Sequence, residues 1–389
     1  MLVALAITGW APAARAQVDD ATFFGVNANR VFNDGLPEAF VDAQLGAIAA
    51  SGITEVRTDA MWAFLEPWAA GNGGFGPFYG ETDRRMLAIA RHGLHWRPVL
   101  DYTPGWQQTV PGDDHSAPRD PGAFAHFAAV FAARYGRAGE FWREHPELPY
   151  LPVQAYEIWN EENTARFWRP SPEPDRYADL YLQARGAIKA IDPGASVVVG
   201  GLGHGAESFL AAMVAARPEV AGQVDAVALH PYEPTVRGVV RNIARASAAL
   251  KALTGHAMPV AVTEVGWESA PGSQDVLNTP ERDRADTMTR LVLAIAKLRQ
   301  RGQVSVLLPY TWWTPRRNPA DGEDWYGLAA DDGSLTPAGA AYVDAIDVVG
   351  DVRRPIAERI VTPTVRSHSH EPALPGLRRS PLPHGAADR

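Results

Sequence analysis

The sequence predicts one α/β domain folded as a (β/α)8 barrel of the TIM type. Eight short apolar or β-branched segments are spaced along the chain, and stretches with helical spacing of apolar residues lie between them. Glycine-containing turns separate many of these segments. Strict alternation of strand and helix implies a parallel sheet, and eight repeats of the unit are the number that closes such a sheet into a barrel.

The candidate strands are, in order, Phe23–Asn27, Glu55–Met61, His95–Tyr102, Ala155–Glu161, Ser196–Leu202, Asp225–Tyr232, Pro259–Trp267 and Val304–Trp312. Apolar residues recur at helical spacing within 40–49, 124–135, 177–188 and 288–298. Gly52, Gly93 and Gly136 follow expected helix ends, and the turn 192–194 leads into the fifth strand. Each expected helix therefore leads back to a strand.

A doubly wound open sheet is the competing fold. It normally carries a glycine-rich phosphate turn after its first strand. Residues 24–29 contain no G-x-G-x-x-G motif, and no G-x-x-x-x-G-K-[ST] loop occurs elsewhere. The glycine-rich segment 200–205 has the wrong spacing and is interpreted as a tight strand-to-helix turn. The barrel is therefore favoured.

Composition excludes several classes of protein. The chain has 389 residues, of which 46% are hydrophobic and 21% charged, which is typical of a globular protein with a substantial core. Its formal net charge of -9, without a basic stripe, disfavours nucleic acid as a partner. Cysteine is absent, which excludes thiol catalysis, thiolate metal sites and disulfides.

Residues 1–16 have the pattern of an export signal. The run from Leu2 to Ala14 is apolar, and Ala14-Arg15-Ala16 before Gln17 has the small-x-small form of a signal peptidase site. We therefore expect a secreted or periplasmic protein whose mature chain begins at Gln17. A positively charged start is missing, so a buried N-terminal helix and an upstream start codon stay open. The run is shorter than the ~20 apolar residues that span a membrane.

Two boundaries follow from composition. The barrel domain is expected to occupy 17–349. The segment 350–389 is rich in proline and arginine and poor in large apolar residues after Ile360, which predicts a disordered tail.

Two glutamates at predicted strand ends form a candidate catalytic pair. Glu161 follows Asn160 at the end of the fourth strand, and Glu264 lies near the end of the seventh. In a barrel of this type the reactive groups lie at the carboxyl ends of the strands. Two carboxyl groups at one such site are what cleavage of a glycosidic bond requires. Either glutamate alone would be an ordinary polar side chain.

Supporting polar residues can be assigned by strand position. Alternation places Glu157 deeper on the side of the barrel shared by Trp159 and Glu161, where a buried carboxylate needs a partner. Arg57 on the second strand is the candidate partner, or orients the nucleophile. On the sixth strand His230 and Tyr232 share a side, from which the tyrosine hydroxyl can reach Glu264.

Nine of the twelve tryptophans fall at strand ends or in the following loops, among them Trp106, Trp312 and Trp313. Aromatic faces lining a cleft suit the C–H surface of a sugar ring, so these three are candidate substrate-binding residues. The tryptophans on several loops favour a groove for internal cleavage over a pocket for terminal cleavage. No H-x-H or H-E-x-x-H motif occurs within the expected barrel domain, 17–349, and no metal site is expected.

With these motifs the chain resembles glycoside hydrolase clan A, the barrel hydrolases with two glutamates on strands four and seven, and family 39 most closely. The resemblance covers roughly residues 21–349. It implies that Glu161 is the acid/base, that Asn160 binds the sugar 2-hydroxyl, and that Glu264 is the nucleophile. It also implies that Arg57, His230 and Tyr232 support the site and that Trp312 or Trp313 forms the floor under the cleaved sugar.

The chain departs from the family pattern in one place, since Glu162 follows Asn160-Glu161 where the family usually has proline. The implied activity is cleavage of β-glycosidic bonds with retention of configuration, by a monomer without a cofactor. We expect the pKa of Glu161 to be raised by Trp159 and by the charge of Glu264. A transglycosidase and a non-catalytic carbohydrate-binding barrel are the alternatives. The sugar, its linkage and the choice between internal and terminal cleavage stay open.

Overall fold

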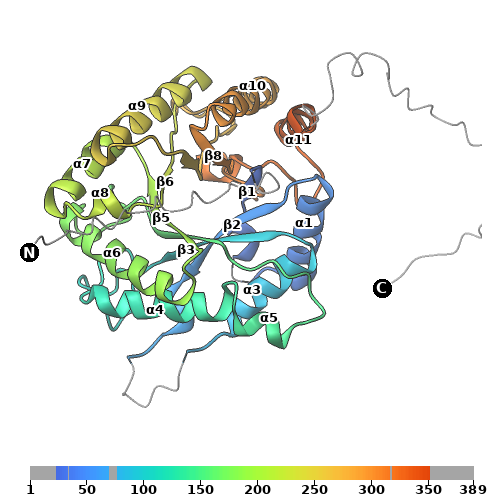
Figure 1. Cartoon of the computed structure of the whole chain (residues 1–389). Helices are drawn as coiled ribbons and strands as arrows, with labels where there is room; N and C mark the ends of the chain where they lie inside the picture. Colours follow the sequence, from blue (N-terminus) through green and yellow to red (C-terminus); the bar gives the residue numbers. More distant parts are fainter. Residues whose placement is uncertain (1–22, 34, 70–76, 316–317, 351–389) are drawn as a thin grey trace, which may run out of the picture. The chain divides into compact units, whose positions relative to one another are not determined.

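The computed structural model describes residues 23–33, 35–69, 77–315 and 318–350, and it confirms the predicted barrel (Figure 1). The strands are β1 Gly25–Asn27, β2 Glu55–Met61, β3 His95–Asp101, β4 Ala155–Asn160, β5 Ser196–Leu202, β6 Ala226–Leu229, β7 Val260–Val262 and β8 Val304–Leu307. They pair in parallel and in chain order. A bridge between Phe24 and Leu307 joins the first strand to the last, which closes the sheet.

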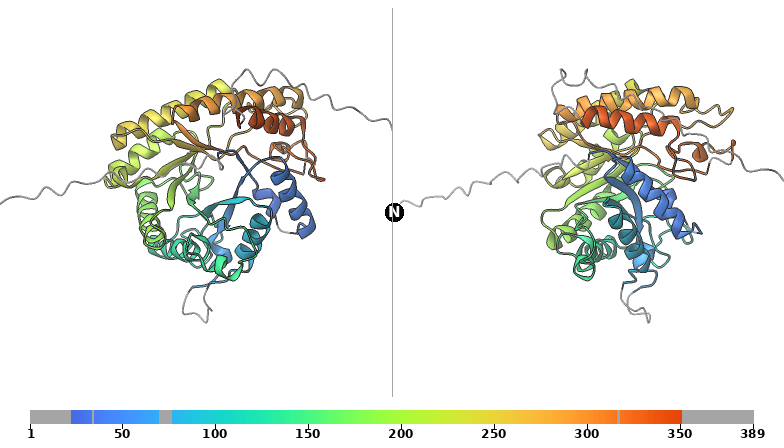
Figure 2. Two further views of the ribbon diagram at one scale, coloured as in Figure 1. Left: turned by 45° about the vertical axis from the view of Figure 1, so that its right-hand side comes forward. Right: turned by 90° about the vertical axis from the view of Figure 1, so that its right-hand side faces the viewer.

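Helices lie around the outside of the strands (Figure 2). They are α1 Glu38–Ala50, α2 Trp62–Leu65, α3 Gly80–Arg91, α4 Pro121–Tyr135, α5 Glu140–Glu144, α6 Pro174–Ile191, α7 Ala206–Ala216, α8 Val220–Gln223, α9 Val236–Thr254, α10 Glu281–Gln300 and α11 Pro337–Gly350, with 3-10 turns η2 Asn29–Phe32 and η3 Gly322–Trp325. Local sequence explains several boundaries. The Asp120 carboxylate accepts a hydrogen bond from Gly122 N at 2.8 Å at the start of α4, and Gly255, with φ of 78°, ends α9.

Side-chain alternation separates an outer core from a smaller inner one. On β5, Val197 and Val199 belong to the large cluster that includes the helices, whereas Val198 faces the barrel axis. The inner cluster consists of small and branched residues, namely Val198, Ala228, Ala261, Val306 and Leu308. Because this layer fills the inside of the barrel, the polar side chains near the carboxyl ends of the strands stand on a packed base.

Several strands end earlier than predicted. β6 ends at Leu229, so His230 and Tyr232 lie just beyond the strand on which they were expected. β7 ends at Val262 and β8 at Leu307, five residues before the expected ends at Trp267 and Trp312. Beyond these points the main chain turns away from the ladder, and Tyr310 N bonds to Val265 O at 3.0 Å. The segments that were expected as strand ends therefore form the mouth of the barrel.

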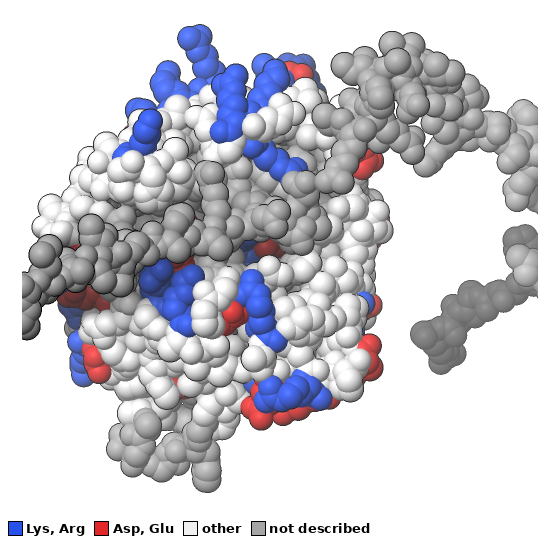
Figure 3. Space-filling view, in the orientation of Figure 1, with Lys and Arg blue, Asp and Glu red and all other residues white. Residues whose placement is uncertain are grey.

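The expected signal, 1–16, and all of the expected tail except Gly350 lie outside the described residues. None of the helices in the described part of the chain has the length and apolar character needed to cross a membrane. In the orientation of Figure 1, lysine and arginine side chains gather over α9 and α10 (Figure 3). Exposed members of this group on α9 are Arg237, Arg241, Arg245 and Lys251. The largest gathering of positive charge on this face is thus carried by outer helices.

Candidate active site

The end of β4 departs from regular strand geometry, and this brings two consecutive residues to the barrel mouth. Trp159 and Glu161 have positive φ angles of 71° and 47°. Trp159 is buried in the outer core and its indole N–H donates to Phe167 O at 2.7 Å. Asn160 and Glu161 both line the pocket. The expectation that Trp159 and Glu161 share one side of a regular strand is therefore wrong, because the backbone reverses its alternation at Trp159.

Glu264 reaches the same place from the opposite side of the barrel. Val262, the last residue of β7, points into the outer core. The next residue, Thr263, is buried, and its hydroxyl lies 3.4 Å from Glu157 Oε1. Glu264 then lines the pocket from the loop that follows. Val262 and Glu264 consequently do not share a strand face, since the strand ends between them.

The two carboxyl groups are close together. Oxygen atoms of Glu161 and Glu264 and a ring nitrogen of His230 all lie within 4.8 Å of one another. His230 Nδ1 is 2.9 Å from Glu161 Oε1 and 3.7 Å from Glu264 Oε2. Sequence spacing did not reveal this triad, because its members come from three different strand ends.

The triad has the residue types of a metal site, as does the group Asp113, Asp114 and His115. At the triad, however, the Arg57 guanidinium donates to Glu264 at 2.6 Å. A fixed positive charge at that distance disfavours a second cation. The triad therefore suits proton chemistry better than metal binding.

Arg57 is the centre of a buried polar network. It is fully buried and donates to both carboxylate oxygens of Glu157 at 2.8 and 3.0 Å, to Glu264 at 2.6 Å, and to Asn160 Oδ1 at 2.9 Å. Since a guanidinium can only donate, Asn160 must present its oxygen to Arg57 and its NH2 group elsewhere. Tyr232 also donates to Glu264, at 3.0 Å. The structure thus brings Arg57, Asn160 and Tyr232 together around Glu264.

The electrostatics of the pair differ from expectation. Burial alone would raise the pKa of Glu161, but the hydrogen bond with His230 and the charges of His230, Arg166 and Arg57 outweigh it and lower this pKa. The expectation of a raised pKa is therefore wrong for the ligand-free protein. Burial raises the pKa of Glu264, against the opposing effects of His230 and Arg57. The two carboxyls titrate as an interacting pair.

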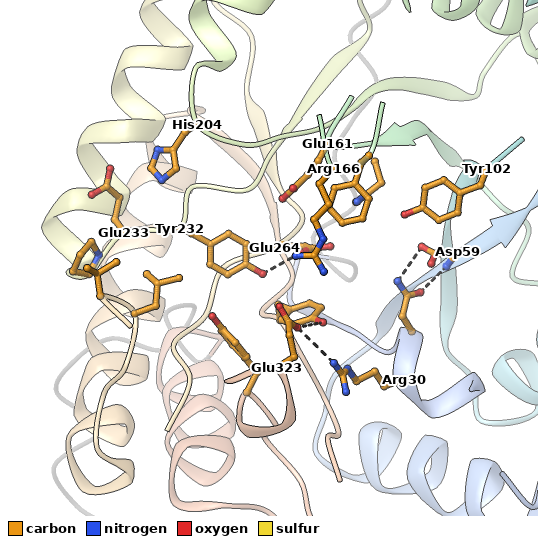
Figure 4. Close-up of a pocket in the computed structure, with 18 residues that line it drawn as sticks. Arg30, Asp59, Tyr102, Glu161, Arg166, His204, Tyr232, Glu233, Glu264 and Glu323 are labelled. Atoms are coloured by element: carbon orange, nitrogen blue, oxygen red, sulfur yellow. Dashed lines mark hydrogen bonds and ion pairs between the residues drawn. The ribbon is translucent and has the colours of Figure 1, made fainter. Parts of the chain in front are cut away.

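The pocket around the pair has a volume of about 530 Å³. Figure 4 shows Tyr232 beside Glu264, with Glu161 and Arg166 on one side and Glu323 and Arg30 on the other. The aromatic lining consists of Tyr102, Phe167, Tyr232, Tyr310 and Tyr326. Its size is in the range of small-molecule sites, and the tyrosine rings offer a ligand both apolar faces and polar hydroxyl groups.

None of the described tryptophans is among the residues that line this pocket, so Trp312 and Trp313, the expected sugar floor, lie outside it. Trp312 is 0% exposed and donates to Gln44 Oε1, and Trp313 is 4% exposed and donates to Asp331 Oδ1. Trp106 is half-buried, and its N–H donates to Glu66 O. Each indole N–H is thus used in packing a loop. Tyr310, two residues before Trp312, lines the pocket instead, since the chain leaves the ladder after Leu307.

Other lining residues were missed by sequence reasoning. Asp59 on β2 bonds to the Asn29 side chain at 2.9 Å, and Arg30 pairs with Asp324 at 3.3 Å and Glu323 at 3.6 Å. Asp59 could have been found, because it follows Arg57 by two residues and so faces the same side. The Arg30 pairs join segments almost three hundred residues apart, for which the sequence carries no local signal.

No known family profile matches the sequence, and no curated protein is similar to it. Solved structures with the same fold include a family 39 glycoside hydrolase from Bacteroides cellulosilyticus WH2, with 18% identity over 86% of this chain and a TM-score of 0.62. This chain covers 65% of the length of that protein, less than two thirds.

A monomeric β-xylosidase from Caulobacter crescentus CB15 is 20% identical over 82% of this chain and 67% of its own, with a TM-score of 0.61. A GH5_18 protein from Streptomyces cattleya, solved with Manb1-4GlcNAc, is 18% identical over 86% of this chain and 82% of its own, with a TM-score of 0.61. At these identities the likeness shows the fold: the chain has the barrel of the clan A glycosidases and resembles family 39.

Proposed function

We propose that this protein is a retaining glycosidase that acts on β-glycosidic bonds, with Glu264 as nucleophile and Glu161 as acid/base. The observation that carries the proposal is the closeness of the two carboxyl groups, whose oxygens lie within 4.8 Å. Retaining glycosidases hold their carboxyls about 5 Å apart, whereas inverting enzymes leave roughly 6.5–9.5 Å for a water molecule.

The hydrogen-bond partners of the two carboxyls suit these roles, whereas the pKa directions in the ligand-free protein, lowered for Glu161 and raised for Glu264, do not. Glu264 receives hydrogen bonds from Arg57 and Tyr232, with Asn27 Nδ2 at 3.4 Å, and these donors orient an ionised nucleophile. Among the described residues, Glu161 has one side-chain hydrogen-bond partner, His230. It is therefore the carboxyl that is freer to exchange a proton with a leaving group.

In the first step Glu264 attacks the anomeric carbon while Glu161 transfers its proton to the departing oxygen. A glycosyl ester forms on Glu264 and the glycosidic bond breaks. The ester carries no negative charge, so its repulsion of a charge on Glu161 disappears, and Glu161 stays ionised and is available as the base. It then takes a proton from water, which attacks the same carbon and releases the sugar with Glu264 ionised.

We infer that the bond cleaved is at the end of a sugar chain. The expectation of a groove depended on loop tryptophans, and most of these are buried. On the side of the pocket opposite Glu161, Arg30 forms ion pairs with Glu323 and Asp324, and Tyr310 donates to Glu323 at 2.8 Å. We infer that these contacts limit the space for further sugars of the glycone on this side. A defined oligosaccharide should release one sugar at a time, and early internal fragments would refute this inference.

The central test uses two variants. Glu161→Ala should keep fast formation of the intermediate from activated aryl glycosides, because a good leaving group needs no proton, and added azide should restore its turnover. Glu264→Ala should fail on activated and ordinary substrates alike, and any azide product should have inverted configuration. Glu55→Gln, at the end of β2 away from the pocket, serves as the control, and its rates on activated and ordinary substrates should equal those of the wild type. Near-normal rates for Glu264→Ala would overturn the assignment.

A transglycosidase would use the same residues, and products formed with a sugar acceptor present distinguish it from a hydrolase. A binding barrel without turnover is the other alternative, and it would bind glycans tightly without releasing sugar. Export of the protein is a separate proposal. The secreted chain should begin at Gln17 when its N-terminus is sequenced, and an intact Met1 on exported material would contradict it.

A further inference from the structure

The pairing between β4 and β5 is interrupted beside the proposed acid/base. Ile158 pairs with Val199 and Asn160 with Gly201, but Trp159 and Gly200 are skipped. At this interruption Trp159 and Glu161 have left-handed backbone conformations, and the consecutive side chains of Asn160 and Glu161 both face the pocket. Residues other than glycine adopt such φ angles only when their surroundings hold them there.

Tyr177, on α6, fills the gap in the ladder. Its hydroxyl donates to Ile158 O at 2.7 Å and accepts from Gly200 N at 2.9 Å, and it is 0% exposed. These two main-chain groups lie on either side of the interruption. A single side chain from an outer helix therefore supplies the hydrogen bonds that the two strands do not make with each other.

Glu162 occupies the space next to this bridge. It is 0% exposed, and neither carboxyl oxygen has a hydrogen-bond partner among the described residues. Gly200 leaves room for it, since a Cβ atom there would overlap Glu162 Oε2 and Trp159 O. Burial raises the pKa of Glu162 well above its usual range, and the nearby charges of Glu157 and Glu161 raise it further. The neighbouring Tyr177 hydroxyl opposes this shift, because it favours the charged form of the carboxyl. The buried Glu162 side chain thus fills the space beside Gly200, directly after Glu161.

We propose that Tyr177 and Glu162 are positioning residues for the acid/base: Tyr177 bridges the interrupted ladder, Glu162 fills the gap at Gly200, and together they hold Glu161 in the pocket. Neither residue lines the pocket. They act through the backbone that carries Glu161. The inference rests on the proposed function, because it assigns a role to the neighbours of the proposed acid/base.

The chain offers a matched pair of variants for the test. Tyr181 lies one helical turn after Tyr177, is equally buried, and its hydroxyl donates to Val197 O at 3.0 Å and accepts from Asp225 N at 3.4 Å. Tyr177→Phe and Tyr181→Phe therefore each remove a buried hydroxyl from the same helix. Both should lower the melting temperature by a similar amount, since each leaves main-chain groups unpaired.

Only Tyr177→Phe should change the chemistry. We expect its kcat/KM to fall by about 10- to 100-fold on glycosides with poor leaving groups, where the proton is needed, and by less than about 3-fold for intermediate formation from activated aryl glycosides. Tyr181→Phe should leave both values near those of the wild type. An identical leaving-group dependence for the two variants would overturn the proposal.

Substitutions of Glu162 separate a space-filling role from the role of a second acid. Glu162→Gln keeps the shape without a carboxyl group, so it should behave as the wild type, whereas Glu162→Ala should show the same leaving-group-dependent loss as Tyr177→Phe. If Glu162→Gln instead lost activity on poor leaving groups while Glu161→Gln kept it, Glu162 would be the acid and the inference would be wrong. Absence of turnover by the wild type on all glycosides would refute the proposed function itself.

Discussion

Removal of the Arg57 side chain should be among the most damaging single changes in the barrel. Arg57→Met keeps much of the volume but leaves Glu157, which is 0% exposed, with the Thr263 hydroxyl at 3.4 Å as its one side-chain hydrogen bond among the described residues. Breaking a buried ion pair by deleting one partner costs about 3–5 kcal/mol of unfolding free energy. We expect a loss of that size in urea denaturation at pH 7.

A double-mutant cycle tests the cause. In Arg57→Met/Glu157→Gln no unpaired charge is buried, so we expect the double variant to be more stable than Arg57→Met alone by about 1–3 kcal/mol. Arg97→Met is the matched control. It breaks the pair between Arg97 and Glu55, at 3.1 Å, near the opposite ends of β2 and β3, where the side chains are 11% and 7% exposed.

Activity separates the two arginines. Arg57→Met removes the 2.6 Å hydrogen bond to Glu264 and should lower kcat/KM by about 10²-fold, because a displaced reacting group costs that much. Arg97→Met should lose stability without losing activity. If both variants lost activity equally, or if the double variant were no more stable than Arg57→Met, the role assigned to the buried network would be refuted.

The remaining predictions concern pH, substrate binding and the tail. The His230 hydrogen bond favours the ionised acid/base, so His230→Phe should raise the pKa of that carboxyl and move the alkaline limb of kcat/KM, where the needed proton is lost, to higher pH. Tyr232→Phe removes a hydrogen-bond donor from the nucleophile and should raise the pKa of Glu264. The acidic limb of kcat/KM, where the nucleophile becomes protonated, should therefore also move to higher pH. A shift of either limb to lower pH would contradict the assignment. Tyr310→Ala should raise KM several-fold, whereas Trp312→Phe should lower the melting temperature with KM unchanged, and the reverse result would restore tryptophan as the sugar floor. Truncation near Arg366 should leave activity and melting temperature unchanged, and a large loss of either would show that the tail contacts the barrel.

The barrel and its two glutamates could be predicted because their signals are local. Apolar segments at regular spacing give the number of strands, and the parallel arrangement places every strand's carboxyl end at one mouth of the barrel. Glu161 and Glu264 were recognisable because each lies at or just beyond such an end. Arg57 was recognisable as a partner, because a buried carboxylate at Glu157 needs a positive charge nearby.

Side-chain direction at the mouth could not be predicted, because it depends on where each ladder stops. Regular alternation assigns Trp159 to the pocket, but a left-handed residue turns it into the core and brings Asn160 and Glu161 in together. β8 likewise ends at Leu307, so Tyr310 lines the pocket and Trp312 is buried.

The sequence by itself determined the fold class, the strand that carries each glutamate and the polar residues around them, since these follow from periodicity and from the parallel sheet. Only the tertiary structure decided the distance between the carboxyls, the hydrogen bond that lowers the pKa of Glu161, and the aromatic lining of the pocket. The physical reason is that these properties depend on atoms from strand ends that lie far apart in the sequence, 69 residues for Glu161 and His230, and on positions where side chains no longer alternate regularly.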